Sequence, residues 1–440
     1  MGCSLGALGD SRCSRKRCVM GLGSLMRTSI RALLLYGFKG LYAILTMVAG
    51  LLVARTFGAS GFGVYALTMT TLSLAIPLGS LGSNYALIEW IPKLPPDRMR
   101  ALASRIVSAV LIASLVVLAP AALVMWLVGD VWLLAWLVLP ATLLVCLIGY
   151  LQGLERQVVA AALDGLGRPL ILCVGLVVAG VLSLDLVPGL AVAMGGSYVL
   201  TVAAALYALR KELHLVRPSL APLADPAHRS GFVVYSLMAL FTTVTAQIDR
   251  YVLNGFYDTA TVGPYAAAQN LMNIVVYATT AAFALLLPRI AAGLAGKTSL
   301  GDMVRQCRRF SRVLLILSFV MIAGAVLLGK PVLALFGDGF ASAHPALIIL
   351  LVGLSVSLFF GFPTSVLSMG EHRRVVIWTM GGSAVLMILA SLILVPLFGV
   401  AGAAVANAIC LVASRLSCHI ALWRIEGYHV AVIGTRPQGL

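Results

Sequence analysis

The sequence predicts an all-α polytopic membrane protein with about twelve transmembrane helices in two six-helix lobes. Of the 440 residues, 61% are hydrophobic and only 10% are charged, whereas a soluble domain carries roughly a quarter charged residues. Long apolar runs recur from Leu33 to Trp423, and many reach the ~20 residues that a helix needs to cross a bilayer. The runs are too long for the strands of a membrane barrel, so the spanning elements are predicted to be helices.

Twelve apolar segments are expected to cross the membrane. Their limits are 31–54, 62–91, 106–127, 132–154, 169–184, 187–209, 231–255, 262–288, 313–329, 343–369, 375–396 and 400–423. If the N-terminus is cytoplasmic, all but four of the 31 Lys and Arg residues lie on the cytoplasmic side or at cytoplasmic span ends, which is the positive-inside pattern. We therefore expect a bacterial cytoplasmic (inner) membrane protein with both termini in the cytoplasm.

The net charge of +16 follows from this topology and does not indicate a nucleic-acid partner. A basic cytoplasmic surface also attracts anionic lipids of the inner leaflet, so membrane lipids are expected partners. The six histidines show no metal-ligand spacing, and no nucleophile and base stand at a recognisable spacing. No catalytic residue, metal or cofactor is expected.

The two halves of the chain repeat one another. Gly63-Val64-Tyr65-Ala66 and Gly263-Pro264-Tyr265-Ala266 match at an offset of 200 residues. Six spans in each half bring both halves into the membrane from the same side, so a pseudo-twofold axis along the membrane normal is expected. The predicted order is a basic cytoplasmic tail (1–30), an N-lobe (31–209), a cytoplasmic linker with three prolines (210–230), a C-lobe (231–424) and a cytoplasmic C-terminal tail (425–440).

Polar side chains lie along single faces of several predicted spans. They are Lys39 and Tyr42 on the first span, Asn84 on the second, Thr243, Gln247, Arg250 and Asn254 on the seventh, and Gln269, Asn273 and Tyr277 on the eighth. Arg55 follows the first span and joins this set. Such faces are costly against lipid, so they indicate either a water-filled substrate cavity between the lobes or hydrogen bonding between helices. For the faces that contain a cation, we expect the cavity.

Three charges are expected inside the membrane. Lys39 lies about 12 Å into its span at 1.5 Å per residue, and either points into the cavity or extends its long stem to the cytoplasmic surface. The same alternatives hold for Arg250 at the outer surface. Asp249 is next to Arg250 but points about 100° away on a helix, so it either braces a neighbouring helix or binds a coupling ion, H+ or Na+.

Four stretches resemble the polysaccharide-transport (oligosaccharide/O-antigen flippase) branch of the multidrug/oligosaccharidyl-lipid/polysaccharide flippase superfamily. They are ARTFGASGFGVYAL (54–67), QIDRYVLNGFYDTATVGPYAAAQNL (247–271), LALFGDGFASAHPALIIL (333–350) and LVPLFGVAGAAVANAI (394–409). The resemblance implies a two-lobe flippase that moves lipid-linked oligosaccharides by alternating access. It also implies, as partners, the lipid-linked oligosaccharide and other polysaccharide-assembly membrane proteins.

Three functions are weighed on this basis. The first is a flippase for a polyprenyl-pyrophosphate-linked oligosaccharide, because pyrophosphate needs cations and sugar needs a polar path. The second is a cation-coupled multidrug exporter, whose cationic substrates would favour an acidic cavity rather than Lys39 and Arg250. The third is a membrane glycan polymerase or glycosyltransferase, which short outer loops disfavour; an enzyme is not expected.

Overall fold

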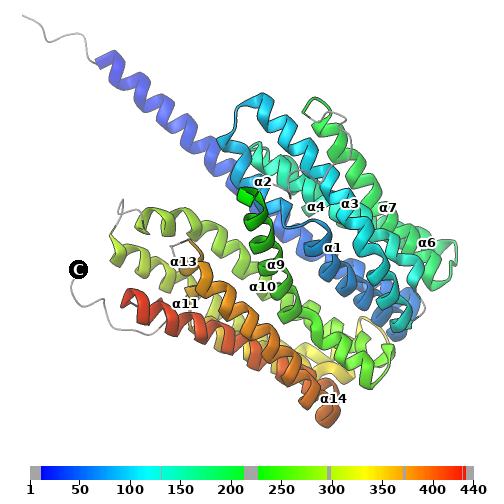
Figure 1. Cartoon of the computed structure of the whole chain (residues 1–440). Coiled ribbons are helices and arrows are strands. Elements are labelled where there is room, and N and C mark those ends of the chain that lie inside the picture. The colour runs from blue at the N-terminus through cyan, green and yellow to red at the C-terminus, as the bar shows by residue number, and fades with distance from the viewer. Residues whose placement is uncertain are drawn as a thin grey trace, which may run out of the picture.

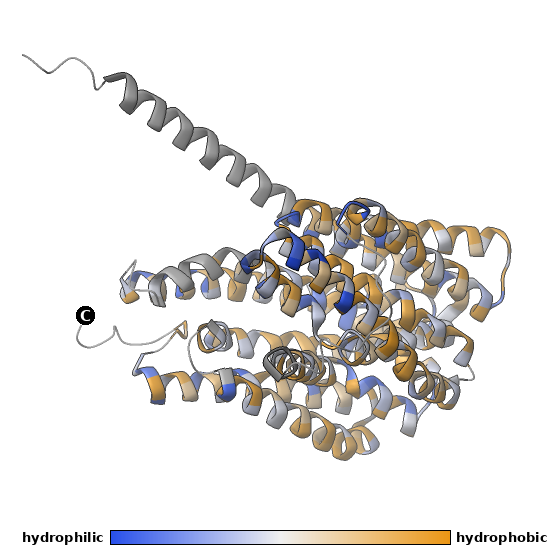
Figure 2. Ribbon diagram, turned by 45° about the horizontal axis from the view of Figure 1, so that its top comes forward, coloured by the Kyte–Doolittle hydropathy of each residue, from blue (hydrophilic) through white to orange (hydrophobic). Residues whose placement is uncertain are grey.

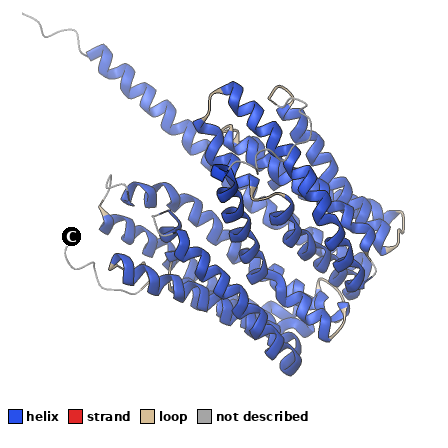
Figure 3. Ribbon diagram, viewed as in Figure 1, coloured by secondary structure: helices blue, strands red, loops and turns tan. Residues whose placement is uncertain are grey.

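The computed structural model of the protein describes residues 11–129, 131–212, 226–294, 299–369, 373–428 and 430–432. Throughout these residues the regular structure is helical and no strand occurs (Figure 3). Nine helical segments among them are long and apolar enough to cross a membrane, and hydrophobic residues predominate along the helices (Figure 2). The prediction of an all-α polytopic membrane protein is confirmed.

The first half of the chain forms one group of helices, drawn in blue to green in Figure 1. Its elements are α1 (Ser11–Gly79), α2 (Ser83–Trp90), η1 (Ile91–Lys93), α3 (Pro96–Gly129), η2 (Trp132–Leu137), α4 (Val138–Gly153), α5 (Gln157–Ala161), a π-helical turn η3 (Ala162–Gly167), α6 (Arg168–Val181) and α7 (Leu186–Leu209).

The second half forms the other group, from green to red in Figure 1. Its elements are α9 (Pro226–Phe256), α10 (Thr259–Leu294), α11 (Leu300–Ala334), η4 (Phe340–Ala343), α12 (His344–Phe359), α13 (Pro363–Met369) and α14 (Arg373–Glu426). α9 begins five residues before the predicted start of the C-lobe, and α1 begins within the predicted N-terminal tail. Most of the predicted linker lies outside the described residues, so the domain boundaries stay predictions.

α1 and α14 each fold back on themselves at a single glycine. Gly58 (φ 70°) and Gly399 (φ 57°) have the only non-helical backbone inside these two helices, and glycine adopts a positive φ without steric cost. A Cβ on Gly50 would lie 3.4 Å from the ring of Phe62, although a straight helix would separate these residues by about 18 Å. In α14, Cys410 Sγ donates to the carbonyl of Ser383 at 3.1 Å. The two residues lie on opposite sides of Gly399, so the two arms of this helix also lie side by side.

Both bends lie between predicted spans, Gly58 between 31–54 and 62–91 and Gly399 between 375–396 and 400–423. Both reversals are made within FGxxG sequences, Phe57 to Gly61 and Phe398 to Gly402. In each sequence the first glycine makes the bend. The second glycine is helical, and a Cβ there would collide with the arm before the bend: with Phe57 at Gly61, and with the carbonyl oxygen of Leu394 at Gly402. Each folded-back helix supplies two antiparallel arms, and α10 is a further long helix beside the nine candidate spans. Twelve crossings remain a prediction.

The two lobes touch most closely where α1 and α10 cross. A Cβ on Gly63 would collide with the carbonyl oxygen of Thr259, and a Cβ on Gly263 would collide with that of Ala59. The two contacts are related by the 200-residue offset of the repeat, since 63 pairs with 259 as 263 pairs with 59. Such small residues let helix backbones approach closely in membranes. The glycines that revealed the repeat therefore form a reciprocal contact between its halves.

Further contacts join the lobes at this same end of the bundle. Phe62 of α1 packs against Phe336 and Phe340, which follow α11, with ring centroids 6.0 and 5.8 Å apart. All three side chains are at most 1% exposed. Ser60 and Thr259 share a hydrogen bond of 2.9 Å. We call this set of contacts the closed end.

Candidate functional site

Three adjoining cavities lie in the part of the bundle away from the closed end. Two of them are lined by residues of both lobes, and one is lined by residues of the C-lobe alone. The first, about 320 Å³, lies beside α1; the second, about 320 Å³, lies beside α13; the third, about 440 Å³, lies beside α9. We name them the α1, α13 and α9 cavities. Thr280 lines both the α1 and α13 cavities, and Met380 lines both the α13 and α9 cavities. The α13 cavity therefore neighbours both of the others, and each cavity has hydroxyl side chains in its lining.

The α1 cavity contains three of the residues that the sequence singled out. Lys39 and Tyr42 line it from α1, and Tyr277 lines it from α10. The rings of Tyr42 and Tyr277 meet edge to face with centroids 5.6 Å apart, so an aromatic pair bridges the lobes here. Lys39 is exposed and makes no ion pair among the described residues, which leaves its ammonium group available to a ligand.

An arginine that sequence reasoning missed supports the wall of this cavity. Arg168 donates from Nε to Asp164 Oδ1 at 2.9 Å and from Nη2 to the Tyr42 hydroxyl at 3.4 Å. Its guanidinium also lies over the rings of Tyr42 and Tyr198, at 5.8 and 5.5 Å from their centroids. Because Arg168 neutralises Asp164, the carboxylate on the wall, Lys39 is left as the uncompensated charge of the α1 cavity.

The π-helical turn explains why Arg168 was overlooked. The predicted fifth span began at residue 169, which placed Arg168 at the membrane surface, but the structure has helix from Gln157 to Val181. The turn Ala162–Gly167 adds a residue to the helix, a feature that often marks functional sites. A signal was present in LDGLGRP (163–169), because Asp164 and Arg168 stand four residues apart, the spacing of a helical ion pair.

Asp249 and Arg250 lie in a separate buried network. Asp249 is fully buried and Arg250 is 8% exposed. Asp249 Oδ2 accepts hydrogen bonds from the Tyr265 hydroxyl (2.5 Å), Gln269 Nε2 (2.9 Å) and Asn407 Nδ2 (3.1 Å). Its Oδ1 accepts one from the backbone N–H of Arg250 at 3.0 Å. The carboxyl group of Asp249 therefore accepts four hydrogen bonds from protein groups inside the bundle.

Arg250 extends the same network to the other lobe. Its Nε donates to Gln269 Oε1 at 2.6 Å, and its Nη1 donates to Thr70 Oγ1 on α1 at 3.3 Å. The network therefore joins α1, α9, α10 and α14. Arg250 lines none of the three cavities, in contrast to the expectation that its face of α9 would line one.

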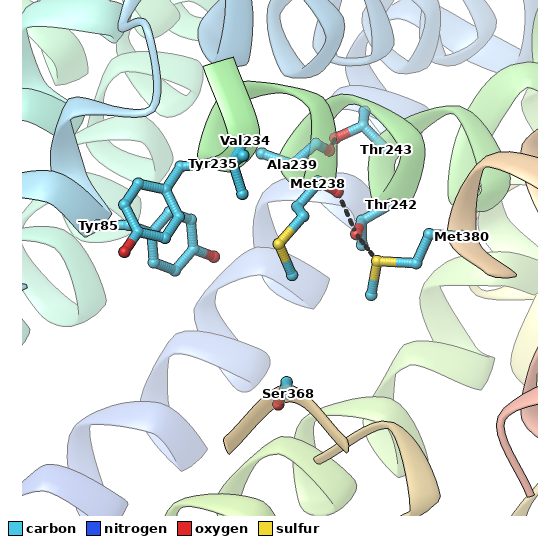
Figure 4. A pocket seen from close by; sticks show the side chains of 9 residues that line it. All are labelled: Tyr85, Val234, Tyr235, Met238, Ala239, Thr242, Thr243, Ser368 and Met380. Carbon is cyan, nitrogen blue, oxygen red and sulfur yellow. Dashed lines mark hydrogen bonds between the residues drawn. The ribbon is translucent and has the colours of Figure 1, made fainter. Parts of the chain in front are cut away.

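The remaining predicted residues are divided between several places. Thr243 lines the α9 cavity, where Figure 4 shows Tyr85 and Tyr235 side by side and Ser368 on the opposite wall. Arg55 lies at the closed end and donates from Nε to the carbonyl of Leu335 at 2.6 Å. Asn84 packs within the N-lobe against Gly149 of α4. Three further residues, Gln247, Asn254 and Asn273, line none of the three cavities. Their side chains make no hydrogen bond within the described part of the chain.

A second arginine that sequence reasoning missed lines the α13 cavity. Arg415 lies there together with the hydroxyl side chains of Ser414 and Ser365, and donates from Nη1 to the carbonyl of Gly361 at 2.9 Å. The predicted last span, 400–423, contained Arg415, but its position near the end suggested the membrane surface. As for metals, the described residues contain no cluster of three or more His, Cys, Asp or Glu side chains that could hold an ion.

Comparisons with known proteins agree with this geometry. The model of the family described as "Polysaccharide biosynthesis protein" matches residues 31–293. The lipid II flippase MurJ in an inward closed conformation superimposes with a TM-score of 0.66 at 13% identity, covering 89% of this chain and 87% of that one. An inward-facing multidrug resistance MATE family transporter of the MOP superfamily gives 0.65 at 15% identity, covering 90% and 98%.

A third solved structure has the same fold. It is a MOP superfamily transporter from Pyrococcus furiosus, with a TM-score of 0.62 at 14% identity over 90% of this chain and 96% of that one. A search of curated protein sequences finds no significant match. At these identities the structural matches show the fold, and the resemblance to the flippase superfamily is confirmed by the family match and the fold together.

Proposed function

The chain belongs to the polysaccharide biosynthesis protein family, and we propose that it flips a polyprenyl-pyrophosphate-linked oligosaccharide from the inner to the outer leaflet of the cytoplasmic membrane. The family and the fold are those of membrane flippases and transporters. The finer assignment is supported by one observation above the others: a cavity between the lobes with an uncompensated cation and a polar, aromatic wall. That cavity is the α1 cavity.

The charge of the α1 cavity favours an anionic headgroup over a cationic drug. Asp164 is paired with Arg168, so Lys39 gives the wall a net positive charge. A lysine ammonium binds phosphate as a point charge, and the interaction is stronger in a partly desolvated cavity than in water. A cationic substrate would be repelled from the same place. Tyr42 and Tyr277 offer flat faces and hydroxyl groups to a sugar ring.

The contacts between the lobes support alternating access. At the closed end the helices meet backbone to backbone through Gly63 and Gly263, while the cavities lie in the other half of the bundle. With the predicted topology, the closed end faces the outside and the cavities face the cytoplasm, the side on which a substrate would be loaded. Transport then requires the closed end to separate, and the substrate drives this only if it binds the two states with different affinity.

Asp249 is proposed as a brace between helices rather than as the site of a coupling ion. Its carboxylate accepts four hydrogen bonds, and ion coupling through H+ or Na+ would require several of them to be released. Transport without a bound cofactor, driven by substrate supply on one side, fits this arrangement. Other polysaccharide-assembly membrane proteins are proposed partners that would supply the lipid-linked substrate and receive it.

The proposal is tested with the purified full-length protein in liposomes. A fluorescent polyprenyl-pyrophosphate oligosaccharide is expected to become accessible in the opposite leaflet only when the protein is present. A cationic dye is expected not to be transported. The reverse result, with dye transported and lipid-linked sugar retained, would assign the multidrug exporter function instead. If neither compound moves and the sugar chain is lengthened or cleaved, the protein would be an enzyme.

A disulfide across the closed end tests alternating access in the same liposomes. In a cysteine-free background, Ser60→Cys and Thr259→Cys place two sulfur atoms where hydroxyl oxygens lie 2.9 Å apart. Oxidation is expected to stop transport, and reduction is expected to restore it. Each single substitution is the control, because it cannot form the cross-link. Full transport with the cross-link formed would contradict opening at this end.

A further inference from the structure

The α13 cavity differs in chemistry from the α1 cavity that it adjoins. Six hydroxyl side chains line it, namely Thr279, Thr280, Ser357, Thr364, Ser365 and Ser414, and Arg415 is the charged residue of its wall. Among the described residues, no carboxylate is part of the lining. Phe362, which is 2% exposed, supplies an aromatic wall. Hydroxyl groups with one cation and one ring make a surface suited to a carbohydrate rather than to a lipid chain.

The hydroxyl groups divide into two kinds. Thr279, Thr280 and Ser357 donate to backbone carbonyls of their own helices, at 2.8, 3.0 and 2.7 Å, so their oxygens still accept from a ligand. Within the described part of the chain, the hydroxyls of Thr364, Ser365 and Ser414 make no hydrogen bond. The wall therefore offers both acceptors and donors, as sugar hydroxyls require.

Arg415 is held in place by a break in the backbone. α12 ends at Phe359 and α13 begins at Pro363, and Gly361 between them has φ +77°. The carbonyl of Gly361 accepts from Arg415 Nη1 at 2.9 Å. The C-terminal segment packs on the same break, because Val432 N donates to the carbonyl of Phe359 at 3.0 Å. Discontinuous helices of this kind form binding sites in transporters.

One hydrogen bond to Gly361 leaves most donors of the guanidinium available. Arginine has five N–H donors in a planar fork that matches the two oxygens of a carboxylate. Arg415 is the single cation among the described lining residues, so its one positive charge does not balance the negative charge of a pyrophosphate group. A monoanionic substituent on a sugar matches the site better.

We propose that the α13 cavity binds a carboxylate-bearing sugar of the transported oligosaccharide, with Arg415 selecting the carboxylate. The inference rests on the proposed function and adds a substrate class to it: acidic oligosaccharides are preferred over neutral ones. The shared lining residue Thr280 places this site next to Lys39 and Tyr42 of the α1 cavity. A headgroup that spans both cavities would place its pyrophosphate at Lys39 and its acidic sugar at Arg415.

The test uses two lipid-linked trisaccharides that differ only in one sugar, glucuronate or glucose, with the full-length protein in liposomes. The wild-type protein is expected to transport the glucuronate lipid about tenfold faster at limiting substrate, since only this lipid offers the guanidinium a charge-assisted hydrogen bond. Arg415→Met is expected to slow the glucuronate lipid about tenfold and to leave the glucose lipid unchanged, so that the preference disappears.

The control is Arg312→Met. Arg312 is exposed on α11 and also donates to a backbone carbonyl, that of Val432 at 3.4 Å, but it lines none of the cavities. It is expected to keep the wild-type preference. If Arg415→Met does not insert stably, Arg415→Lys replaces it and should show a reduced preference, because the planar fork is lost.

Each result bears on the proposal separately from the proposed function. Equal transport of the two lipids by the wild-type protein would overturn the acidic-sugar site while leaving the flippase function intact. Equal slowing of both lipids by Arg415→Met would show that Arg415 has a structural role and does not select the carboxylate, which would also overturn the proposal. Transport of neither lipid would refute the proposed function itself.

Discussion

Two clusters inside this bundle each contain an aspartate, an arginine and a tyrosine, but they differ in how far they are buried. One contains Asp249, Arg250 and Tyr265, and the other contains Asp164, Arg168 and Tyr42. In the first, the carboxylate is fully buried and accepts four hydrogen bonds. In the second, the carboxylate side chain is 47% exposed and lines a cavity beside the unpaired Lys39.

The difference shows that a charge inside the membrane does not by itself mark a binding site. Both arginines have protein partners, as expected for charges inside the membrane: Arg168 is paired with a carboxylate, whereas Arg250 donates to neutral groups on two helices. Arg250 lines none of the three cavities. The wall that Arg168 supports has a neighbouring cation, Lys39, that makes no ion pair with the described residues. Access and unused hydrogen-bonding capacity, rather than charge, distinguish the site from the brace.

The largest effect expected from this comparison is on stability. Asp249→Ala leaves the buried donors of Tyr265, Gln269 and Asn407 without their acceptor. Each buried donor left unsatisfied costs about 1–3 kcal/mol, so the variant is expected to unfold at much lower temperature in detergent and to accumulate poorly. Asp164→Ala is the matched control, and it should cost less, because the Asp164 side chain is 47% exposed and the Arg168 guanidinium keeps its contacts with Tyr42 and Tyr198.

Similar loss of stability in both variants would contradict the distinction between brace and site. Asp249→Asn separates the brace from ion coupling. If Asp249 braces, the amide variant should be less stable, and the protein that inserts should transport with unchanged dependence on H+ and Na+ gradients. If stability is unaffected and only the gradient dependence is lost, the coupling alternative is correct.

Much of the fold could be predicted from the sequence because its signals are local. Apolar runs gave the spans, and the Gly63 and Gly263 repeat predicted two related halves. The reversals at Gly58 and Gly399 fall between predicted spans, but apolar runs alone do not show which residue makes the bend. The FGxxG pattern, which both reversals share, was the available signal.

The site was predicted in part, for a different reason. Polar faces identified Lys39, Tyr42 and Tyr277, which the structure brings to one cavity. The same rule grouped Arg250 with them, and the structure places it in the buried network instead. Helical spacing tells which residues share a face, but not which neighbour covers that face. The bond from Arg250 to Thr70 joins residues 180 positions apart, and no local pattern contains it.

The second effect in size concerns transport. Lys39→Gln removes the uncompensated charge of the α1 cavity and keeps a polar side chain of similar length. We expect transport of the lipid-linked oligosaccharide to fall about tenfold or more, since a hydrogen bond to a charged group contributes about 1.5–3 kcal/mol. Thermal stability should be unchanged. The matched control is Lys330→Gln, an exposed lysine on α11, which should transport normally.

Two measurements decide this prediction together, transport in liposomes and unfolding temperature in detergent. Normal transport by Lys39→Gln would show that the lysine stem reaches the membrane surface and that its charge is not used. A fall in both transport and stability would assign Lys39 a structural role. Either result would remove the contrast between the α1 cavity and the Asp249 network.

The smallest effects compare one hydroxyl from each region by nearly isosteric replacement. Thr70 Oγ1 accepts from Arg250 Nη1 at 3.3 Å within the network, whereas Thr280 is exposed and borders the α1 and α13 cavities. Thr70→Val should lower stability by about 1 kcal/mol through the loss of one buried hydrogen bond, with transport per folded molecule unchanged. Thr280→Val should leave stability unchanged, because the Thr280 hydroxyl donates only to a carbonyl of its own helix. It should slow transport two- to threefold, which corresponds to about 0.5 kcal/mol. The opposite result would be a loss of stability in Thr280→Val and a loss of transport in Thr70→Val. It would assign Thr280 to the brace and Thr70 to the transport path.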